Sequence, residues 1–320
     1  MSVLATVVSP TMGQSGEVNL QPVGDVTTWP DTPYRWMDIA DFLYSFRYQS
    51  FFNYEQPTVK LSFCDISSTF EGTLVASELK PNFAYQVKLV GKPTKVWGAG
   101  GDDWANEQIG YAGRWWRSQP DPGNADDEDY EAHKDDSSYI YEGYLLFDFF
   151  VTNEQGSTNV NLSADSSFHV LWATHDSTND GPGHRYPHAE DGPVRYIEFT
   201  ASPSTNPDVY ATNYGSARVG IYAEWEPDRA LPGQLVLPSG PYNCQFVLTE
   251  ESFHQTGLGG FWASAMRSGN IHFFATIDAE ADIDGDFDID GSDLVMNVSN
   301  QLSVPLNIFA VQFGLTVCRR

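Results

Sequence analysis

Short alternations of apolar and polar residues cover most of the chain, and Gly, Pro, Asn, Asp and Ser residues separate them. Alternation with a period of two is typical of β-strands, because successive side chains of a strand point to opposite faces. Leu145–Val151 is apolar almost throughout, which predicts a central strand that is buried on both faces. The whole pattern predicts strands at residues 58–63, 69–76, 84–90, 139–152, 168–173, 194–201, 217–225, 234–237, 242–249, 271–277 and 304–317.

Helical periodicity is nearly absent from the sequence. The best candidates for helices are two short segments, residues 36–48 and 261–267. Many strands and few helices predict an all-β fold. We expect an antiparallel β-sandwich of jelly-roll or immunoglobulin-like type, with long loops and one or two short helices.

Two segments share a pattern in which a Leu and a Pro precede a Tyr that opens an alternating strand. The first runs from Leu79 to Tyr85, and the second runs from Leu237 to Tyr242. The pattern resembles the tyrosine corner of immunoglobulin-like and fibronectin-type sandwiches. The resemblance implies that each phenol forms a hydrogen bond back to the upstream backbone.

The net charge of the chain limits the kinds of molecule that it is expected to bind. The 320 residues include 43 Asp and Glu against 17 Lys and Arg, for a formal net charge of -26. This balance argues against a nucleic-acid partner, because phosphate binding requires clustered Lys and Arg. No apolar run is long enough for a membrane span, so we expect no membrane insertion. The acidity instead fits cation binding and an extracellular or cell-surface location, and the apolar residues 1–10 are either the remainder of a signal peptide or a first strand.

The three cysteines are Cys64, Cys244 and Cys318, too few for a disulfide scaffold and without a zinc-binding spacing. Cys64 and Cys244 both lie in or beside predicted strands and resemble the core cysteines of immunoglobulin-like domains. A Cys64–Cys244 disulfide is therefore one hypothesis, and Cys318 is the other candidate partner.

The clearest motif lies near the C-terminus, where Asp recurs at regular intervals. Ca²⁺ prefers about six to eight oxygen ligands, and this spacing supplies them from one continuous segment. Ile289, at loop position 8, is expected to turn inward. We predict a structural Ca²⁺ site that ties the last strand to the body. Acidic side chains fall at loop positions 1, 3, 5, 7, 9 and 12, which are Asp282, Asp284, Asp286, Asp288, Asp290 and Asp293.

This loop, with Phe309, Phe313 and Gly314 after it, resembles a single dockerin-type repeat of secreted and cell-surface prokaryotic proteins. The resemblance implies calcium binding through an EF-hand-like loop. The chain departs from the family because Phe287 replaces the usual Gly and because only one loop is present. Residues 295–304, where a helix normally follows, include several poor helix formers. A single loop does not imply binding to a cohesin, the partner of paired dockerin repeats.

These patterns predict two parts. The first is a sandwich body at residues 1–278, either as one unit or as halves near 1–155 and 156–278. The second is a C-terminal unit at residues 279–320, which holds the calcium loop and the last strand.

Two further loops carry candidate cation ligands. Residues 118–137 are rich in Asp and Glu, and a second Ca²⁺ site there or in the loop at 176–191 is one interpretation. Imidazoles near carboxylates also suit a transition metal, although a solvated polar loop is the favoured interpretation. The histidines concerned are His169, His175, His184 and His188.

Four tryptophans close to Gly-rich turns are candidates for a carbohydrate-binding platform. Exposed indoles stack on sugar rings, whereas burial in the core is the usual alternative. These residues are Trp97, Trp104, Trp115 and Trp116.

Paired carboxylates are the chemistry of glycoside hydrolysis, and two groups have that composition. The first is Glu224 with Glu226, and the second is Glu250 with Glu251 and His254. Ion pairs that close a strand are the favoured interpretation of both groups. Because no serine-hydrolase, P-loop or dinucleotide motif is present, we predict that the protein is not an enzyme.

The sequence thus favours an extracellular, calcium-stabilised structural or assembly protein. Its favoured partner is another copy of itself, as in a surface filament or sheath joined by strand exchange through the apolar segments 3–8 and 304–317. The alternatives are a carbohydrate-binding module, with a polysaccharide as partner, and a glycoside-active enzyme that uses Glu224, Glu226 or Glu250.

Overall fold

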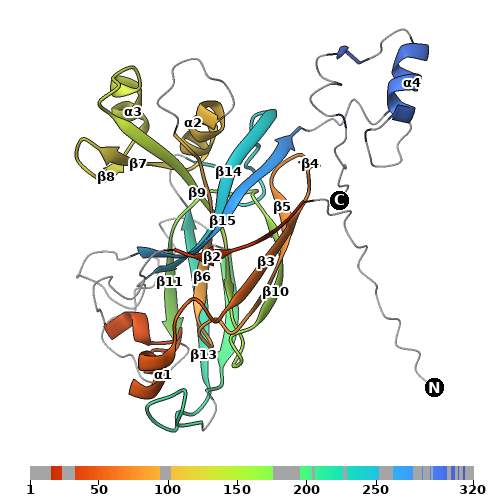
Figure 1. Cartoon of the computed structure of the whole chain (residues 1–320). Coiled ribbons are helices and arrows are strands. Elements are labelled where there is room, and N and C mark those ends of the chain that lie inside the picture. Colours follow the sequence, from red (N-terminus) through yellow and green to blue (C-terminus); the bar gives the residue numbers. More distant parts are fainter. Residues whose placement is uncertain are drawn as a thin grey trace, which may run out of the picture.

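The computed structural model shows a mostly β chain with a few short helices, which confirms the predicted predominance of strands (Figure 1). Nearly all the strand pairs are antiparallel. The residues that the structure describes are 16–23, 33–93, 102–175, 195–203, 206–225, 229–251, 262–276, 283, 289, 291–300, 304–306, 309 and 313.

The strands form one large sheet and two smaller ones. The large sheet has the order β2 (Gln21–Pro22), β15 (Trp262–Ala275), β14 (Gly240–Glu251), β6 (Ala84–Val90), β9 (Ile140–Val151), β7 (Arg114–Gln119) and β8 (Gly123–Ala125), and β4 (Ile66–Ser67) runs parallel to β15. The four-stranded sheet has the order β1 (Gly16–Asn19), β3 (Thr58–Phe63), β5 (Glu71–Ser77) and β10 (Thr158–Ser163). The three-stranded sheet has the order β11 (Phe168–His175), β13 (Ala217–Trp225) and β12 (Arg195–Ala201).

The helix predicted at 36–48 is wrong for most of its length, because only residues 46–48 are helical, as the start of α1 (Phe46–Phe51). Before them, the Asp38 carboxylate accepts hydrogen bonds from the backbone N–H groups of Ala40 and Phe42, so the chain turns there. The helix predicted at 261–267 is wrong where it is described, because residues 262–267 belong to the long strand β15, whose edge pairs with β14. The predicted strand 234–237 is a turn and coil. The helices that form are α1 (Phe46–Phe51), α2 (Asp102–Ala112), α3 (Asp127–His133) and α4 (Gly291–Ser299), after a 3-10 turn at Pro33–Trp36.

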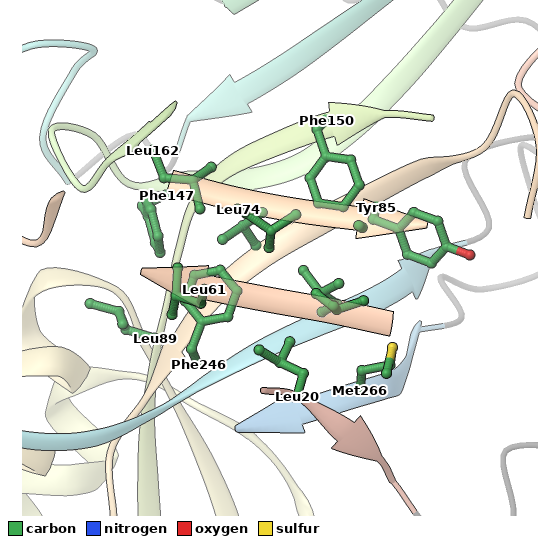
Figure 2. Packing of buried hydrophobic residues seen from close by; sticks show 14 of the residues in the cluster. Leu20, Leu61, Leu74, Tyr85, Leu89, Phe147, Phe150, Leu162, Phe246 and Met266 are labelled. Atoms are coloured by element: carbon green, nitrogen blue, oxygen red, sulfur yellow. The ribbon is translucent and has the colours of Figure 1, made fainter. Parts of the chain in front are cut away.

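Strand β9 is buried on both faces, as its apolar sequence predicts. Leu145 and Phe147 belong to the main core, which also contains Leu61 of β3 and Leu74 of β5 (Figure 2). Leu146 and other residues of β9 belong to a second core, formed with the three-stranded sheet. The large sheet therefore shares one core with each of the smaller sheets.

Phe70 lies at the centre of the main core and is fully buried. Its ring contacts Phe147, Phe246 and Phe273 at centroid distances of 5.8, 6.0 and 5.3 Å. Edge-to-face and offset aromatic pairs of this kind add to the free energy gained by burying the rings.

Both tyrosine-corner segments form the expected hydrogen bonds. The Tyr85 hydroxyl accepts from the Lys80 backbone N–H at 3.2 Å, and the Tyr242 hydroxyl donates to the Pro238 carbonyl at 3.0 Å. Each corner therefore fixes the start of a strand of the large sheet, β6 or β14.

We predict that Phe70→Ala lowers the free energy of unfolding by about 3–5 kcal/mol, because it leaves a cavity among packed rings. The control is Phe46→Ala, since Phe46 is 86% exposed and its loss should change stability by less than about 0.5 kcal/mol. Chemical denaturation of both variants measures the difference. Equal losses would contradict the central position of Phe70.

Candidate functional site

The C-terminal unit begins its helix inside the predicted calcium loop. Helix α4 starts at Gly291, directly after Asp290, so a helix does follow the loop despite the poor helix formers at 295–304. Residues 295–299 are helical although they include poor helix formers, and the Asn297 side chain binds the segment that follows the helix. This side chain accepts from the Val304 N–H at 2.9 Å and donates to the Val304 carbonyl at 3.0 Å.

Two residues of the predicted calcium loop, Ile289 and Asp293, are buried. Ile289 is fully buried and packs with Ile66 of β4, Val304 and Phe309. This confirms that position 8 turns inward, and it joins the C-terminal unit to the body. Asp293, at position 12, is also fully buried, and its Oδ1 accepts from the Ile283 N–H at 2.6 Å.

A carboxylate that is held in place away from water suits a cation ligand, because Ca²⁺ binds carboxylate oxygens. Asp293 is the one predicted ligand whose surroundings can be described. The other five ligands, Asp282, Asp284, Asp286, Asp288 and Asp290, lie outside the described residues. Within the described residues no cluster of three or more His, Cys, Asp or Glu side chains could hold a metal ion.

The last predicted strand, 304–317, is wrong where the structure describes it. The Phe309 N–H donates to the Pro305 carbonyl at 3.0 Å, and the Phe313 N–H donates to the Phe309 carbonyl at 2.9 Å. Both are helical i to i−4 bonds. Strand exchange through this segment therefore has no support from its described residues.

The cysteines correct one hypothesis. Cys64 is buried and disulfide-bonded, whereas Cys244 is a free thiol in the main core. The hypothesis of a Cys64–Cys244 disulfide is therefore wrong. Cys318 lies outside the described residues. Burial raises the pKa of the Cys244 thiol well above its ordinary value, which keeps it unreactive.

Of the three candidate tryptophans that the structure describes, Trp115 is not at the surface. Trp115 is fully buried, stacks on Tyr130 at 3.7 Å and donates from Nε1 to Asp127 at 2.9 Å. It is therefore unavailable to a sugar ring. Trp104 is half-buried and packs edge-on against Tyr242 at 5.1 Å. Trp116 is half-buried, and Trp97 lies outside the described residues.

The acidic segment 118–137 is ordered by local pairing. Asp126 caps α3 by accepting from the Asp129 N–H at 2.8 Å. Asp127 binds the Arg229 guanidinium through both oxygens, at 2.8 and 2.7 Å. Arg117 donates to both carboxylate oxygens of Asp129, at 3.1 and 3.0 Å. Much of this charge therefore stabilises α3 and its contacts with β7.

A cavity of about 500 Å³ opens between these ion pairs. Its principal residues combine guanidinium groups with carboxylates and one phenol: Arg114, Arg117, Arg229, Asp126, Asp129 and Tyr144. The sequence does not predict this cavity, because Arg229 is far from the others along the chain. Its ion pair with Asp127 holds it against α3.

The structure describes only part of each candidate catalytic group. Glu224 is half-buried on β13, and Glu226, the side chain of Glu251 and His254 lie outside the described residues. Glu250 is buried, with its Oε1 2.8 Å from Lys80 Nζ. Of the histidines, His169 contacts Arg114 at 2.5 Å, and the side chains of His175, His184 and His188 lie outside the described residues.

Comparison with known proteins gives no relative. No family model, curated protein or solved structure matches the chain. No helix in the described ranges is long and apolar enough to cross a membrane. The function must therefore be argued from the residues themselves.

The Asp127–Arg229 pair predicts an acid-sensitive contribution to stability. Burial raises the pKa of Asp127, but hydrogen bonds from Arg229 and Trp115 outweigh it, so the pKa lies below its ordinary value. A carboxylate of this kind stabilises the fold at neutral pH and loses that contribution as pH falls below the ordinary carboxyl range. Between about pH 6 and about pH 3, the free energy of unfolding of Arg229→Met should therefore fall by less than that of the unmodified protein. Urea denaturation at both pH values measures the difference.

The matched control is Arg218→Met, because Arg218 pairs with Glu198 at the surface and both side chains are about half exposed. Solvent screens such a pair, so the acid dependence should match that of the unmodified protein. An unchanged acid dependence in Arg229→Met would contradict the assignment.

Proposed function

We propose that this protein is an extracellular structural protein with a β-sandwich body, stabilised by Ca²⁺ in its C-terminal loop and assembled with copies of itself. The observation that carries the proposal is the C-terminal unit. It combines an aspartate-rich loop with a helix that exposes apolar side chains.

The calcium part rests on the agreement between motif and local structure. A loop that delivers oxygen ligands from alternating positions and passes directly into a helix is the architecture of EF-hand-type sites. Ile289 and Asp293 occupy the inward positions that such a site requires. Without a cation, the neighbouring carboxylates would repel one another, so Ca²⁺ would stabilise the loop and, through Ile66, its attachment to the body.

The assembly part rests on the outer face of α4. The helix buries two polar residues, Asp293 and Asn297, and exposes apolar ones. A soluble monomer rarely gathers exposed apolar side chains on one short helix, so this face fits an interface. A second copy would offer the same face, which permits a two-fold contact. The exposed apolar residues of the unit are Leu294, Val295, Met296, Val298, Leu306 and Phe313, each 37% exposed or more.

The extracellular location is supported by the disulfide of Cys64 and by the strong negative charge. Disulfides persist in oxidising compartments and are rare in the cytosol. A formal charge of -26 also favours millimolar calcium over phosphate-bearing partners.

The alternatives have less support. The feature that supports a carbohydrate-binding module is the arginine-lined cavity beside α3 rather than the tryptophans. Such a cavity would suit an acidic sugar. For a glycoside-active enzyme, Glu250 is buried and its carboxylate is paired with Lys80.

Calcium should stabilise the full chain in a loop-dependent manner. At a free Ca²⁺ concentration about 100 times Kd, the free energy of unfolding should rise by about 2.7 kcal/mol. Asp286→Asn removes one predicted ligand and should abolish most of this rise, whereas Asp135→Asn removes the same charge from an exposed site and should preserve it. Calorimetry with Ca²⁺ and with a chelator measures both. No response to Ca²⁺ in the unmodified protein would contradict the calcium site.

Self-association should depend on the outer face of α4. Val298→Glu places a charge on a side chain that is 59% exposed and should shift the protein to monomer, measured by light scattering after size-exclusion chromatography. Val236→Glu is the control, because Val236 is 66% exposed and belongs to the coil before β14 rather than to the C-terminal unit. A protein that is monomeric at all calcium and protein concentrations would contradict the assembly proposal.

A further inference from the structure

Lys80 is the most deeply buried cation of the described body. Its side chain is 0% exposed, and its Nζ lies 2.8 Å from Glu250 Oε1 and 2.8 Å from the Arg35 carbonyl. Aromatic rings enclose the amine, with the centroids of Trp36 and Phe83 at 4.8 and 4.7 Å. The amine and the carboxyl group therefore meet in a site without bulk water.

Burial changes the chemistry of this lysine. It lowers the pKa of Lys80 to about 8, although the Glu250 charge opposes the shift, and the Arg35 charge lowers the pKa further. An amine that loses its proton near neutral pH is a nucleophile, whereas an ammonium group is not.

The groups around Glu250 are those that an acyl transfer requires. Arg35 Nε lies 3.4 Å from Glu250 Oε2, where its charge would stabilise a developing oxyanion. Tyr54 donates a hydrogen bond to Oε1, and the Tyr85 hydroxyl lies 3.1 Å from that of Tyr54. The two phenols form a path along which a proton can reach the departing oxygen.

We propose that Lys80 and Glu250 condense to an intramolecular amide bond that cross-links the body. The Lys80 Nζ attacks the Glu250 carboxyl carbon, a C–N bond forms, and the bond from that carbon to Oε1 breaks. Oε1 leaves as water and takes up two protons, both supplied by the Lys80–Glu250 pair and relayed in part through Tyr54. Oε2 becomes the amide oxygen and continues to face Arg35. No oxidant, reductant or co-reactant is needed.

The site favours the product as well as the reaction. The new amide N–H keeps the Arg35 carbonyl as its acceptor. Because the aromatic walls exclude water, hydrolysis of the amide lacks a nucleophile.

The cross-link would join two neighbouring strands of the large sheet at the same end. Lys80 precedes β6 in its tyrosine corner, and Glu250 lies near the end of β14, beside the Thr249–Gln86 pair of these strands. A covalent bond there would close a long loop of the chain and stabilise the folded state against unfolding. This role is separate from calcium binding and from assembly, and it does not depend on either.

The test is the intact mass of the purified full chain after reduction of its disulfide. The cross-linked protein should be lighter than its sequence mass by one water molecule. Proteolytic digestion and tandem mass spectrometry should then yield a branched peptide that joins the segments containing Lys80 and Glu250.

Two variants make the assignment specific. Lys80→Met cannot form the amide and should have its full sequence mass. Lys88→Met alters the other buried lysine of the described core, which lies over the Tyr144 ring, and should still lack one water. Should Lys80→Met fail to fold, the branched peptide of the unmodified protein decides alone. A folded protein at full sequence mass, without the branched peptide, would overturn the proposal. Lys80 and Glu250 would then form only a non-covalent ion pair.

Discussion

The burial of both faces of β9 is the constraint on which the rest of the structure depends. Leu145 and Phe147 need an apolar layer on one side, while Leu146 and Phe149 need another on the opposite side. Each such side chain gains about 1.5–3 kcal/mol on burial, so neither face can be left in water. Residues of the four-stranded sheet share a core with Leu145 and Phe147, and residues of the three-stranded sheet share a second core with Leu146 and Phe149.

A strand order of this kind also buries polar groups where strands begin and end, and these groups must find partners. Lys80 meets Glu250, and Asp38 accepts from two backbone N–H groups and from Tyr210. Burial nevertheless raises the pKa of Asp38 to about 7, so keeping this carboxyl group ionised in the folded protein costs free energy. Buried ionic groups often add little net stability, but they specify one arrangement, since every alternative leaves a charge unpaired. The amide proposed between Lys80 and Glu250 would make that arrangement permanent.

Much of the fold could be predicted from the sequence because it depends on local alternation. The predicted strands 58–63, 84–90 and 217–225 coincide with β3, β6 and β13. The turn in the first part of the predicted helix 36–48 could not be predicted, because it depends on which groups the Asp38 side chain binds. Residues 262–267 form a strand because they pair with the edge of β14, which is a tertiary effect that propensity does not contain.

In the candidate sites, too, local features could be predicted from the sequence and long-range contacts could not. The spacing of aspartates predicted the inward side chain of Ile289, because the loop geometry is local. The arginine-lined cavity and the Lys80–Glu250 contact could not be predicted, since each joins residues far apart in the sequence. Helix α4 was missed because its sequence includes poor helix formers, and propensity does not contain the contacts of a helix with its surroundings, such as the hydrogen bonds of Asn297 to Val304.

The central claim is that the C-terminal loop holds Ca²⁺ as part of an extracellular structural protein. The most direct measurement is a crystal structure of the full chain grown with Ca²⁺, with anomalous scattering used to locate the ion. The account predicts one ion at the loop, bound by about six to eight oxygen atoms at about 2.3–2.6 Å, with Asp293 among the ligands or hydrogen-bonded to one. An ordered loop without an ion at saturating Ca²⁺ would contradict it.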